Sequence, residues 1–296
     1  MANLKEVRIR IASVKSTKQI TSAMKMVAAA RLRKAQNAIL TLRPYAAKLH
    51  EIMQDVGGNL ENSGENPFTM AREANKVLVV AVTSNRGLCG GFNINVVKRV
   101  IQMLNGDLSR QYKSGQVDLF CIGKKGADLL KSREYPIKDV ETEIFNKLAF
   151  EFVTPIAEKF MQEYLAGDYD KIILVYNQFK NAAVQLLQTE QFLPIADTEK
   201  TFVEEKATTQ VNYIFEPGKQ EILTELIPKT LKIQLYKALL DSLAAEHGAR
   251  MTAMHKATDN ATELIKDLKL KYNKARQAAI TNEILEIVSG AEALKG

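Results

Sequence analysis

The sequence of 296 residues has no tryptophan, only two cysteines and only three histidines. Cys89 and Cys121 cannot build a disulfide framework, and no Cys/His spacing has the form of a zinc site, so we expect a reducing compartment and no metal. The longest apolar runs, such as residues 77–82, are far shorter than the ~20 residues that cross a bilayer. The N-terminus lacks an apolar core of secretory length, so we expect neither a signal peptide nor a membrane span.

Glycine is missing from one end of the chain and proline from the other. Residues 1–56 contain no glycine, and residues 229–296 contain no proline. Because both residue types interrupt helices, the ends are predicted to be long helices. Hydrophobic residues make up 46% and charged residues 25% of the chain. This balance is typical of a globular protein, and it excludes disordered and collagen-like chains.

The N-terminal segment has the apolar spacing of a coiled-coil seam, with alternating steps of three and four residues. The seam positions are Leu32, Ala35, Ile39, Leu42, Ala46, Leu49, Met53 and Val56, with the same spacing earlier at Leu4, Val7, Ile11 and Val14. Between these stretches, Ile20, Met24 and Val27 continue the seam if its phase slips near Lys18. Pro44 lies inside the pattern, and because the seam resumes in phase we expect a bend within one helix.

The C-terminal segment has an equally regular seam of smaller and softer residues. Its positions are Leu240, Ala244, His247, Met251, Met254, Thr258, Ala261, Ile265, Leu268, Tyr272, Ala275 and Ala279. Neither segment can bury its apolar stripe alone, so we expect the two helices to form an antiparallel hairpin.

The two predicted helices differ in length. At ~1.5 Å per residue, a C-terminal helix over about 219–289 extends roughly 25 Å beyond an N-terminal helix over 3–56. This overhang carries the apolar residues Ile280, Ile284, Leu285, Ile287 and Val288. Exposed apolar patches mark interaction surfaces, although folding back onto the central domain or burial in a homo-oligomer stays open.

The central region alternates strands with helices. The predicted strands are Lys76–Val82, Val117–Ile122, Lys171–Tyr176, Ala182–Gln188 and Val211–Phe215, and the predicted helices are Asn93–Lys113, Lys124–Arg133 and Leu148–Leu165. This order predicts an α/β fold with a small, mostly parallel, Rossmann-like sheet, joined to the long antiparallel coiled coil. We expect the segments 1–56, 57–218 and 219–296, with the turn-rich residues 57–75 as a connector.

A glycine-rich turn, Ser84-Asn-Arg-Gly-Leu-Cys-Gly-Gly-Phe-Asn93, directly follows the first predicted strand. It lacks the spacing of either common phosphate-binding loop. Gly87-Leu-Cys-Gly-Gly91 has the form of a nucleophile elbow with cysteine. However, His50, His247 and His255 all lie in the terminal helices, so the central domain has no histidine to activate the thiol. A structural turn is favoured, with phosphate binding and a cysteine hydrolase as alternatives.

Positive charge is concentrated in residues 1–56, which hold 11 lysines and arginines against 3 acidic residues. The net charges of residues 57–218 and 219–296 are −3 and +2. This distribution favours an acidic partner for the first helix. A basic coiled-coil nucleic-acid-binding protein is the alternative, but Tyr45 is the only aromatic residue of the segment, and nucleic-acid binders interleave aromatic side chains.

Several stretches resemble the gamma subunit of F-type ATP synthases. They are Lys18-Gln-Ile-Thr-Ser-Ala-Met-Lys-Met-Val-Ala-Ala, the loop Arg86-Gly-Leu-Cys-Gly-Gly, and the C-terminal Ala249-Arg-Met-Thr-Ala-Met, Tyr272-Asn-Lys-Ala-Arg-Gln-Ala and Glu286-Ile-Val-Ser-Gly. The resemblance implies a non-catalytic rotor shaft in the central stalk. Proton flow turns the membrane c ring together with this shaft, whose rotation drives the beta catalytic sites through successive states of ATP synthesis or hydrolysis.

The resemblance also implies partners and contact residues. Met24, Arg86, Arg276, Gln277, Thr281 and Glu283 match positions that meet the beta subunit, and Ile284, Leu285, Ile287 and Val288 belong to the tip in the socket of the alpha–beta hexamer. Phe215 and Glu216 resemble a stretch near epsilon and the c ring. The implied protein binds no cofactor, is present once per complex, and is attached through the c ring to the cytoplasmic side of a bacterial inner membrane.

Overall fold

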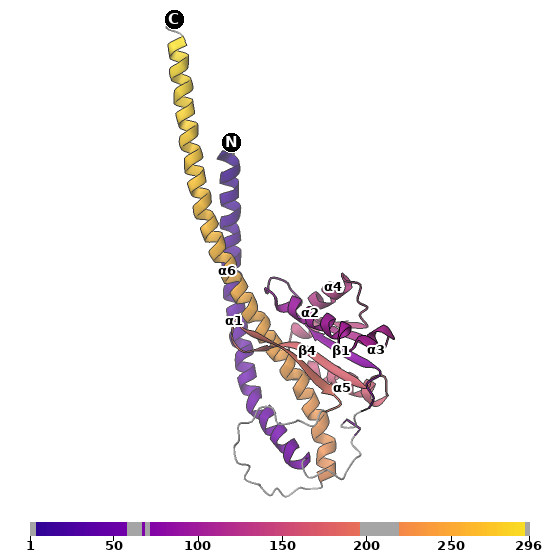
Figure 1. Ribbon diagram of the computed structural model, residues 1–296. Coiled ribbons are helices and arrows are strands. Elements are labelled where there is room, and N and C mark those ends of the chain that lie inside the picture. Colours follow the sequence, from indigo (N-terminus) through magenta and orange to yellow (C-terminus); the bar gives the residue numbers. More distant parts are fainter. Residues whose placement is uncertain (1–3, 58–66, 69–71, 196–218, 294–296) are drawn as a thin grey trace. The chain divides into compact units, whose positions relative to one another are not determined.

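The computed structural model describes residues 4–57, 67–68, 72–195 and 219–293. Helix α1 (Leu4–Gly57) and helix α6 (Lys219–Ala293) are the long terminal helices, and a sheet with shorter helices lies between them in the sequence (Figure 1). The predicted long helices are therefore confirmed, and α1 continues through Pro44 as one helix. The chain divides into two compact units, Met1–Ala29 with Arg250–Gly296, and Ala30–Ala249.

The first unit is an antiparallel pair formed by the N-terminal part of α1 and the C-terminal part of α6 (Figure 1). Val7 of α1 is buried, as are Met254, Ala261 and Leu268 of α6. The predicted α6 seam is confirmed from Leu240 to Ala275, where each of its positions is buried or half-buried, whereas its last predicted position, Ala279, is exposed.

The seam of α1 does not slip near Lys18, so that prediction was wrong. Ile20 and Val27, predicted to face α6, are 57% and 54% exposed, whereas Thr21 and Ala28 are buried. The helix keeps its heptad phase, since a stutter would locally change the winding of the supercoil. Polar residues therefore occupy seam positions.

Two threonine hydroxyls satisfy each other at the centre of this polar part of the seam. The Oγ1 atoms of Thr21 and Thr258 are hydrogen-bonded at 2.8 Å, and Thr21 is 8% exposed. The half-buried Lys18 and Lys25 occupy the seam positions on either side of Thr21. Long lysine side chains can cover apolar surface with their methylene groups while the ammonium stays in water.

The second unit contains a five-stranded sheet in the order β3-β2-β1-β4-β5. The first four strands are parallel, and β5 pairs antiparallel with β4, which confirms the predicted mostly parallel sheet. The strands are β1 (Val77–Val82), β2 (Val117–Ile122), β3 (Asp139–Glu141), β4 (Lys171–Phe179) and β5 (Gln185–Leu193). The short β3 was not predicted, and the predicted strand Val211–Phe215 lies outside the described residues.

The shorter helices largely follow the prediction. They are α2 (Phe92–Asn105), α3 (Ser109–Lys113), α4 (Lys124–Lys131), the 3-10 helix η1 (Glu143–Phe145) and α5 (Phe150–Leu165). The single helix predicted over Asn93–Lys113 is divided in two, because Gly106 ends α2 by donating its N–H to the carbonyls of Gln102 and Met103.

Both faces of the sheet are covered, which explains why β1 is buried along its whole length. Side chains of α2 and α4 cover one face, whereas α5 and the first third of α6 cover the other. On the second face the Phe160 ring packs edge-on against Phe120 at 5.1 Å and Phe192 at 6.2 Å. Leu231, Leu235 and Leu239 of α6 belong to the same core. The base of α6 is thus part of the core of the α/β domain.

Candidate partner-contact surfaces

Among the described residues, no helix lies beside the C-terminal end of α6. Thr21 pairs with Thr258, so an antiparallel register places Leu4, the first residue of α1, opposite Ala275. Residues 276–292 are all exposed. The overhang from Ala275 to Ala293 is therefore about 27 Å long at 1.5 Å per residue. The predicted overhang is confirmed in position and length.

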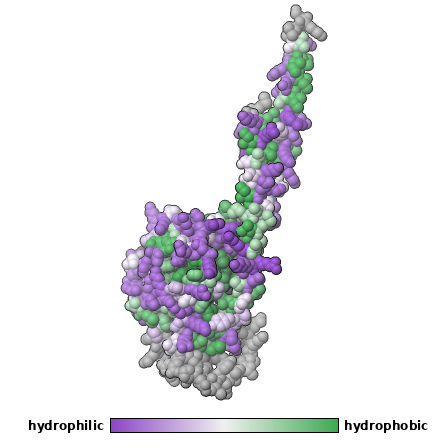
Figure 2. Space-filling model, turned by 180° about the vertical axis from the view of Figure 1, so that it is seen from behind, coloured by the Kyte–Doolittle hydropathy of each residue, from purple (hydrophilic) through white to green (hydrophobic). Residues whose placement is uncertain are grey.

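The overhang presents a large apolar surface to solvent. Figure 2 shows hydrophobic residues along the free end of α6, and the five predicted side chains, Ile280, Ile284, Leu285, Ile287 and Val288, are between 48% and 67% exposed. Single exposed aliphatic residues are ordinary, but five within nine residues on an unaccompanied helix are not. This part of the chain has the composition of a surface that another molecule covers.

Polar residues on the same overhang complete the predicted tip. Arg276, Gln277, Thr281 and Glu283 are all exposed. The Thr281 hydroxyl donates a hydrogen bond to the Gln277 carbonyl at 3.0 Å, one turn earlier in the helix. Met24 lies instead on the paired part of α1 and is half-buried. The described structure thus groups four of the predicted beta contacts on one segment and places Met24 on another helix.

The glycine-rich loop after β1 is closed by its own hydrogen bonds. Asn93 Oδ1 accepts the N–H of Ser84 at 2.9 Å, and Asn93 Nδ2 donates to Ser84 Oγ at 2.8 Å and to Cys89 Sγ at 3.2 Å. Cys89 is 2% exposed and packs with Phe92, Ala245 and Ala249. Burial among neutral partners suits a structural residue rather than a nucleophile.

The tip of this loop points outward. Arg86 is exposed, and Leu88 is 65% exposed with a φ of 64°, a left-handed conformation that costs energy for a residue with a side chain. Gly90 also has a positive φ of 61°. The loop therefore holds Arg86 and Leu88 at the surface on a framework fixed by Ser84 and Asn93.

Residues at the end of β1 and the start of the loop also cap a neighbouring helix. The first three N–H groups of α4 donate to Asn85 Oδ1, the Ser84 carbonyl and Thr83 Oγ1, each at 3.0 Å. A Cβ atom on Gly126 would lie 2.5 Å from Thr83 Oγ1. Thr83, Ser84 and Asn85 thus have a structural role in holding the start of α4 against the end of β1.

The second cysteine is equally shielded. Cys121 on β2 is fully buried, and burial raises the pKa of its thiol to about 12. It remains protonated and unreactive at neutral pH. Phe215 and Glu216, the predicted contacts with epsilon and the c ring, lie outside the described residues.

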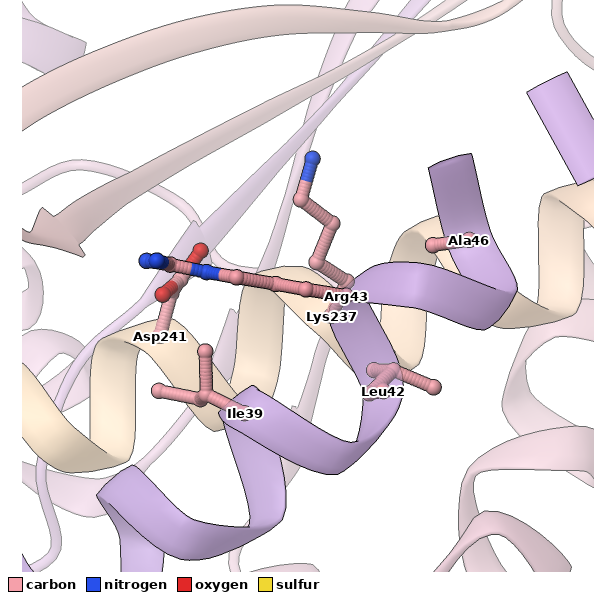
Figure 3. A pocket seen from close by; sticks show the side chains of 6 residues that line it. All are labelled: Ile39, Leu42, Arg43, Ala46, Lys237 and Asp241. Carbon is pink, nitrogen blue, oxygen red and sulfur yellow. The ribbon is translucent and has the colours of Figure 1, made fainter. Parts of the chain in front are cut away.

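A small pocket in the second unit contains a functional group that sequence reasoning missed. It is lined by Ile39, Leu42, Arg43 and Ala46 of α1 and by Lys237 and Asp241 of α6 (Figure 3). Asp241 is 2% exposed, and its Oδ1 has no hydrogen-bond partner. The sequence could have indicated this buried carboxylate, because Asp241 lies within the mostly apolar run Ala238-Leu-Leu-Asp-Ser-Leu.

Glu190 of β5 lies near this pocket and is held by two hydrogen bonds. Tyr176 donates its hydroxyl to Glu190 Oε2 at 2.8 Å, and Gln234 Nε2 donates to Oε1 at 2.7 Å. Burial and the adjacent Glu190 carboxylate raise the pKa of Tyr176, so the phenol stays protonated and keeps donating.

Within the described residues, no helix is both long and apolar enough to cross a bilayer. His255 Nδ1 lies 3.2 Å from Asp259 Oδ2, one helical turn later on the surface of α6, and His247 is buried on the seam.

Comparison with known proteins gives the family. The model of the ATP synthase family matches residues 3–294. The ATP synthase gamma chain of Flavobacterium johnsoniae is 58% identical over 296 residues, which cover both chains completely. A chain of the central stalk and c ring of the Tetrahymena thermophila mitochondrial ATP synthase is similar at 25% identity and a TM-score of 0.58, over 80% of this chain and 99% of the other. A chain of the Euglena gracilis mitochondrial enzyme shares the fold, with a TM-score of 0.71 at 21% identity over 98% and 94%. The chain belongs to the gamma chain family of ATP synthases.

Proposed function

We propose that this chain, as the central-stalk rotor subunit of an F-type ATP synthase, transmits rotation through the overhang of α6. The overhang enters the socket of the alpha–beta hexamer, and the α/β domain with the base of the hairpin meets epsilon and the c ring. The chain is a non-catalytic subunit, and nucleotide chemistry belongs to alpha and beta.

The observation that carries this proposal is the unaccompanied apolar end of α6. No other helix of the described residues covers these aliphatic side chains, since α1 begins at Leu4, opposite Ala275. Apolar contacts are non-directional, so they hold a shaft in a socket without hydrogen bonds that must break at particular angles. A surface of this chemistry suits a bearing that turns.

Polar contacts serve a different purpose in the proposed mechanism. The proposed contacts with beta subunits are Arg276, Gln277, Thr281 and Glu283 on the overhang, Met24 on α1 and Arg86 on the loop after β1, all of them exposed except the half-buried Met24. An exposed ion pair contributes about 0–1 kcal/mol. Such contacts form and release as the shaft turns.

The remaining parts of the proposal concern assembly. One copy of the chain serves one complex. Phe215 and Glu216, within the central segment 57–218, contact epsilon and the c ring, and the terminal segments 1–56 and 219–296 form the shaft. The c ring holds the chain at the cytoplasmic side of the bacterial inner membrane. The nucleic-acid-binding alternative has no support among the related proteins, and the positive charge of α1 suits acidic beta loops instead.

The test is a comparison of two aspartate substitutions in the assembled complex. Ile287 on the overhang is 67% exposed and Leu165 at the end of α5 is 46% exposed, so neither change disturbs a buried core. We expect Ile287→Asp to lower proton-driven ATP synthesis at least about tenfold, because ~1.4 kcal/mol of lost apolar contact has that effect, whereas Leu165→Asp leaves it unchanged.

Subunit counting completes the test. Complexes extracted gently from membranes should contain one copy of this chain for every three beta subunits. A different ratio, absence of the chain from the complex, or equal synthesis by both variants would contradict the proposal.

A further inference from the structure

The pocket at the base of the hairpin holds a charge arrangement that the rotor function does not require. Asp241 of α6 is a buried carboxylate without a hydrogen bond at Oδ1, and the described contacts give it no neutralising ion pair within bonding distance. In Figure 3 the guanidinium of Arg43 points from α1 toward this carboxylate. We propose that the contact between α6 and α1 around the buried Asp241, which we call the clasp, is proton-sensitive, and that Arg43 partly offsets the cost of the buried charge.

The groups that face Asp241 come from three elements. Arg43 on α1 and Lys237 on α6 are cations that favour the ionised carboxylate, and Glu190 on β5 is an anion that opposes it. Burial is the strongest influence, since it removes the charge from water. Tyr176, which donates to Glu190, stays protonated and adds no charge.

Burial therefore dominates and raises the pKa of Asp241 to about 6, from 3.8 for a free aspartate. At pH 5 the folded unit holds a proton that the unfolded chain has lost, so folding is favoured by protonation. As the pH rises through about 6, Asp241 loses this proton and protonation no longer stabilises the folded unit. The buried carboxylate then destabilises the fold, and Arg43 and Lys237 offset only part of that destabilisation. The clasp is thus tighter at pH 5 than at pH 7.5.

The position of the clasp gives it a consequence for the shaft. Ile39 and Leu42, which line the same pocket, belong to the seam by which α1 packs on the base of α6. Weakening this contact lets α1 open locally from α6 at the position where α6 packs on the α/β domain. Any effect on torque transmission depends on the proposed rotor function, whereas the clasp itself does not.

The test measures amide hydrogen exchange of α1 residues 32–46 in the full chain between pH 4.5 and 8, corrected for the intrinsic pH dependence of exchange. In the wild type, the equilibrium constant for local opening should rise about 30-fold from pH 4.5 to pH 8, because the pKa of the Asp241 carboxyl is about 6 when buried and 3.8 when free. Asp241→Asn should abolish this rise. Asp267→Asn, at an exposed position of α6, should retain it.

Two further variants test which neighbours set the midpoint. Arg43→Met keeps the aliphatic stem and removes the cation, so the midpoint should move to higher pH. Glu190→Gln keeps an acceptor for Tyr176 and removes the anion, so the midpoint should move to lower pH. These shifts serve as the decisive readout even if Asp241→Asn fails to fold.

The proposal is overturned if Asp241→Asn opens with the wild-type pH dependence, or if Arg43→Met moves the midpoint downward. Subunit analysis of the membrane complex separates the two proposals. If the rotor proposal fails, the wild-type chain is missing from the complex but its hydrogen-exchange midpoint is unchanged.

Discussion

Thr21 and Thr258 form the polar cross-link between the two helices of the first unit. Each Oγ1 also lies within hydrogen-bonding distance of a carbonyl of its own helix, Thr21 of Lys18 at 3.1 Å and Thr258 of Met254 at 2.8 Å. Because each hydroxyl has one proton, one threonine donates to the other while its partner donates to its own helix. A buried hydroxyl that has partners costs little, whereas one that loses its partner costs about 1–3 kcal/mol. The pair therefore lets two polar side chains occupy a seam that is otherwise apolar.

A double-mutant cycle should detect this pair as an energetic unit. We expect Thr21→Ala and Thr258→Ala each to lower the free energy of unfolding, with a coupling energy of about 0.5–1.5 kcal/mol between them, because each change removes the same hydrogen bond. Urea unfolding of the full chain measures all four corners. Thr17→Ala is the control, because Thr17 is exposed and bonds only within its helix, to the Ser13 carbonyl at 3.1 Å. Additive effects would mean that the hydroxyls do not stabilise each other.

The choice between Ile20 and Thr21 shows where sequence reasoning fails at this scale. Side-chain hydrophobicity alone favours burial of Ile20 and Val27, which requires a change of phase. The structure keeps an unbroken heptad instead and leaves both residues more than half exposed. An unbroken heptad geometry is thus favoured over the apolar burial that Ile20 and Val27 would have gained from a change of phase. Only the spacing from Val14 to Leu32, which fits the heptad without a slip, could have indicated this.

At the scale of elements, the two glycines of α6 have opposite surroundings. A Cβ on Gly248 would lie 3.2 Å from the Cα of Ala182, in the turn between β4 and β5, and 3.4 Å from the Phe179 ring. Gly290 has no atom within 4 Å of such a Cβ. Gly248 thus permits close approach of the β4–β5 hairpin to the helix, whereas Gly290 only weakens the helix.

Substitution should therefore have opposite effects at these two positions. We expect Gly248→Val to lower the free energy of unfolding by about 1–3 kcal/mol, since the side chain must displace the turn backbone. Gly290→Ala should increase helicity at the tip and stabilise it by up to about 1 kcal/mol. Circular dichroism during thermal unfolding checks both. Stabilisation by Gly248→Val would show that the turn moves away at little cost.

The elements themselves were largely predictable because their signals are local. Strands β1, β2 and β4 are apolar runs buried on both faces, and the terminal helices have sustained heptads. The three-residue β3 is too short to have a pattern of its own, and it forms because Phe120, Cys121 and Ile122 of β2 offer a paired edge. The antiparallel β5 begins and ends later than predicted, since its register is set by β4 rather than by its own partly exposed residues.

At the scale of the whole chain, the residues proposed to contact partners are largely distinct from the residues that stabilise the fold. Much of the predicted contact surface, the overhang after Ala275, touches nothing else in the described structure, and residues 276–292 are all exposed. A segment without tertiary contacts adds little to the stability of the chain that carries it. Asp241 is the opposite case. Its carboxyl is buried by residues from several elements, so no local sequence motif predicts its raised pKa.

Deletion of the overhang should therefore impair coupling without impairing folding. A chain ending at Ala275 should unfold with a free energy within about 0.5 kcal/mol of the full chain, because only exposed residues are removed. Its affinity for the alpha–beta hexamer should fall at least about tenfold, since full burial of one aliphatic side chain contributes about 1.5–3 kcal/mol and five are lost. A chain ending at Glu292, which keeps all five, serves as the control. Sedimentation of reconstituted complexes and urea unfolding provide the two measurements. A large loss of stability would instead indicate that the tip packs on its own chain, and unchanged affinity would remove the overhang from the hexamer contact.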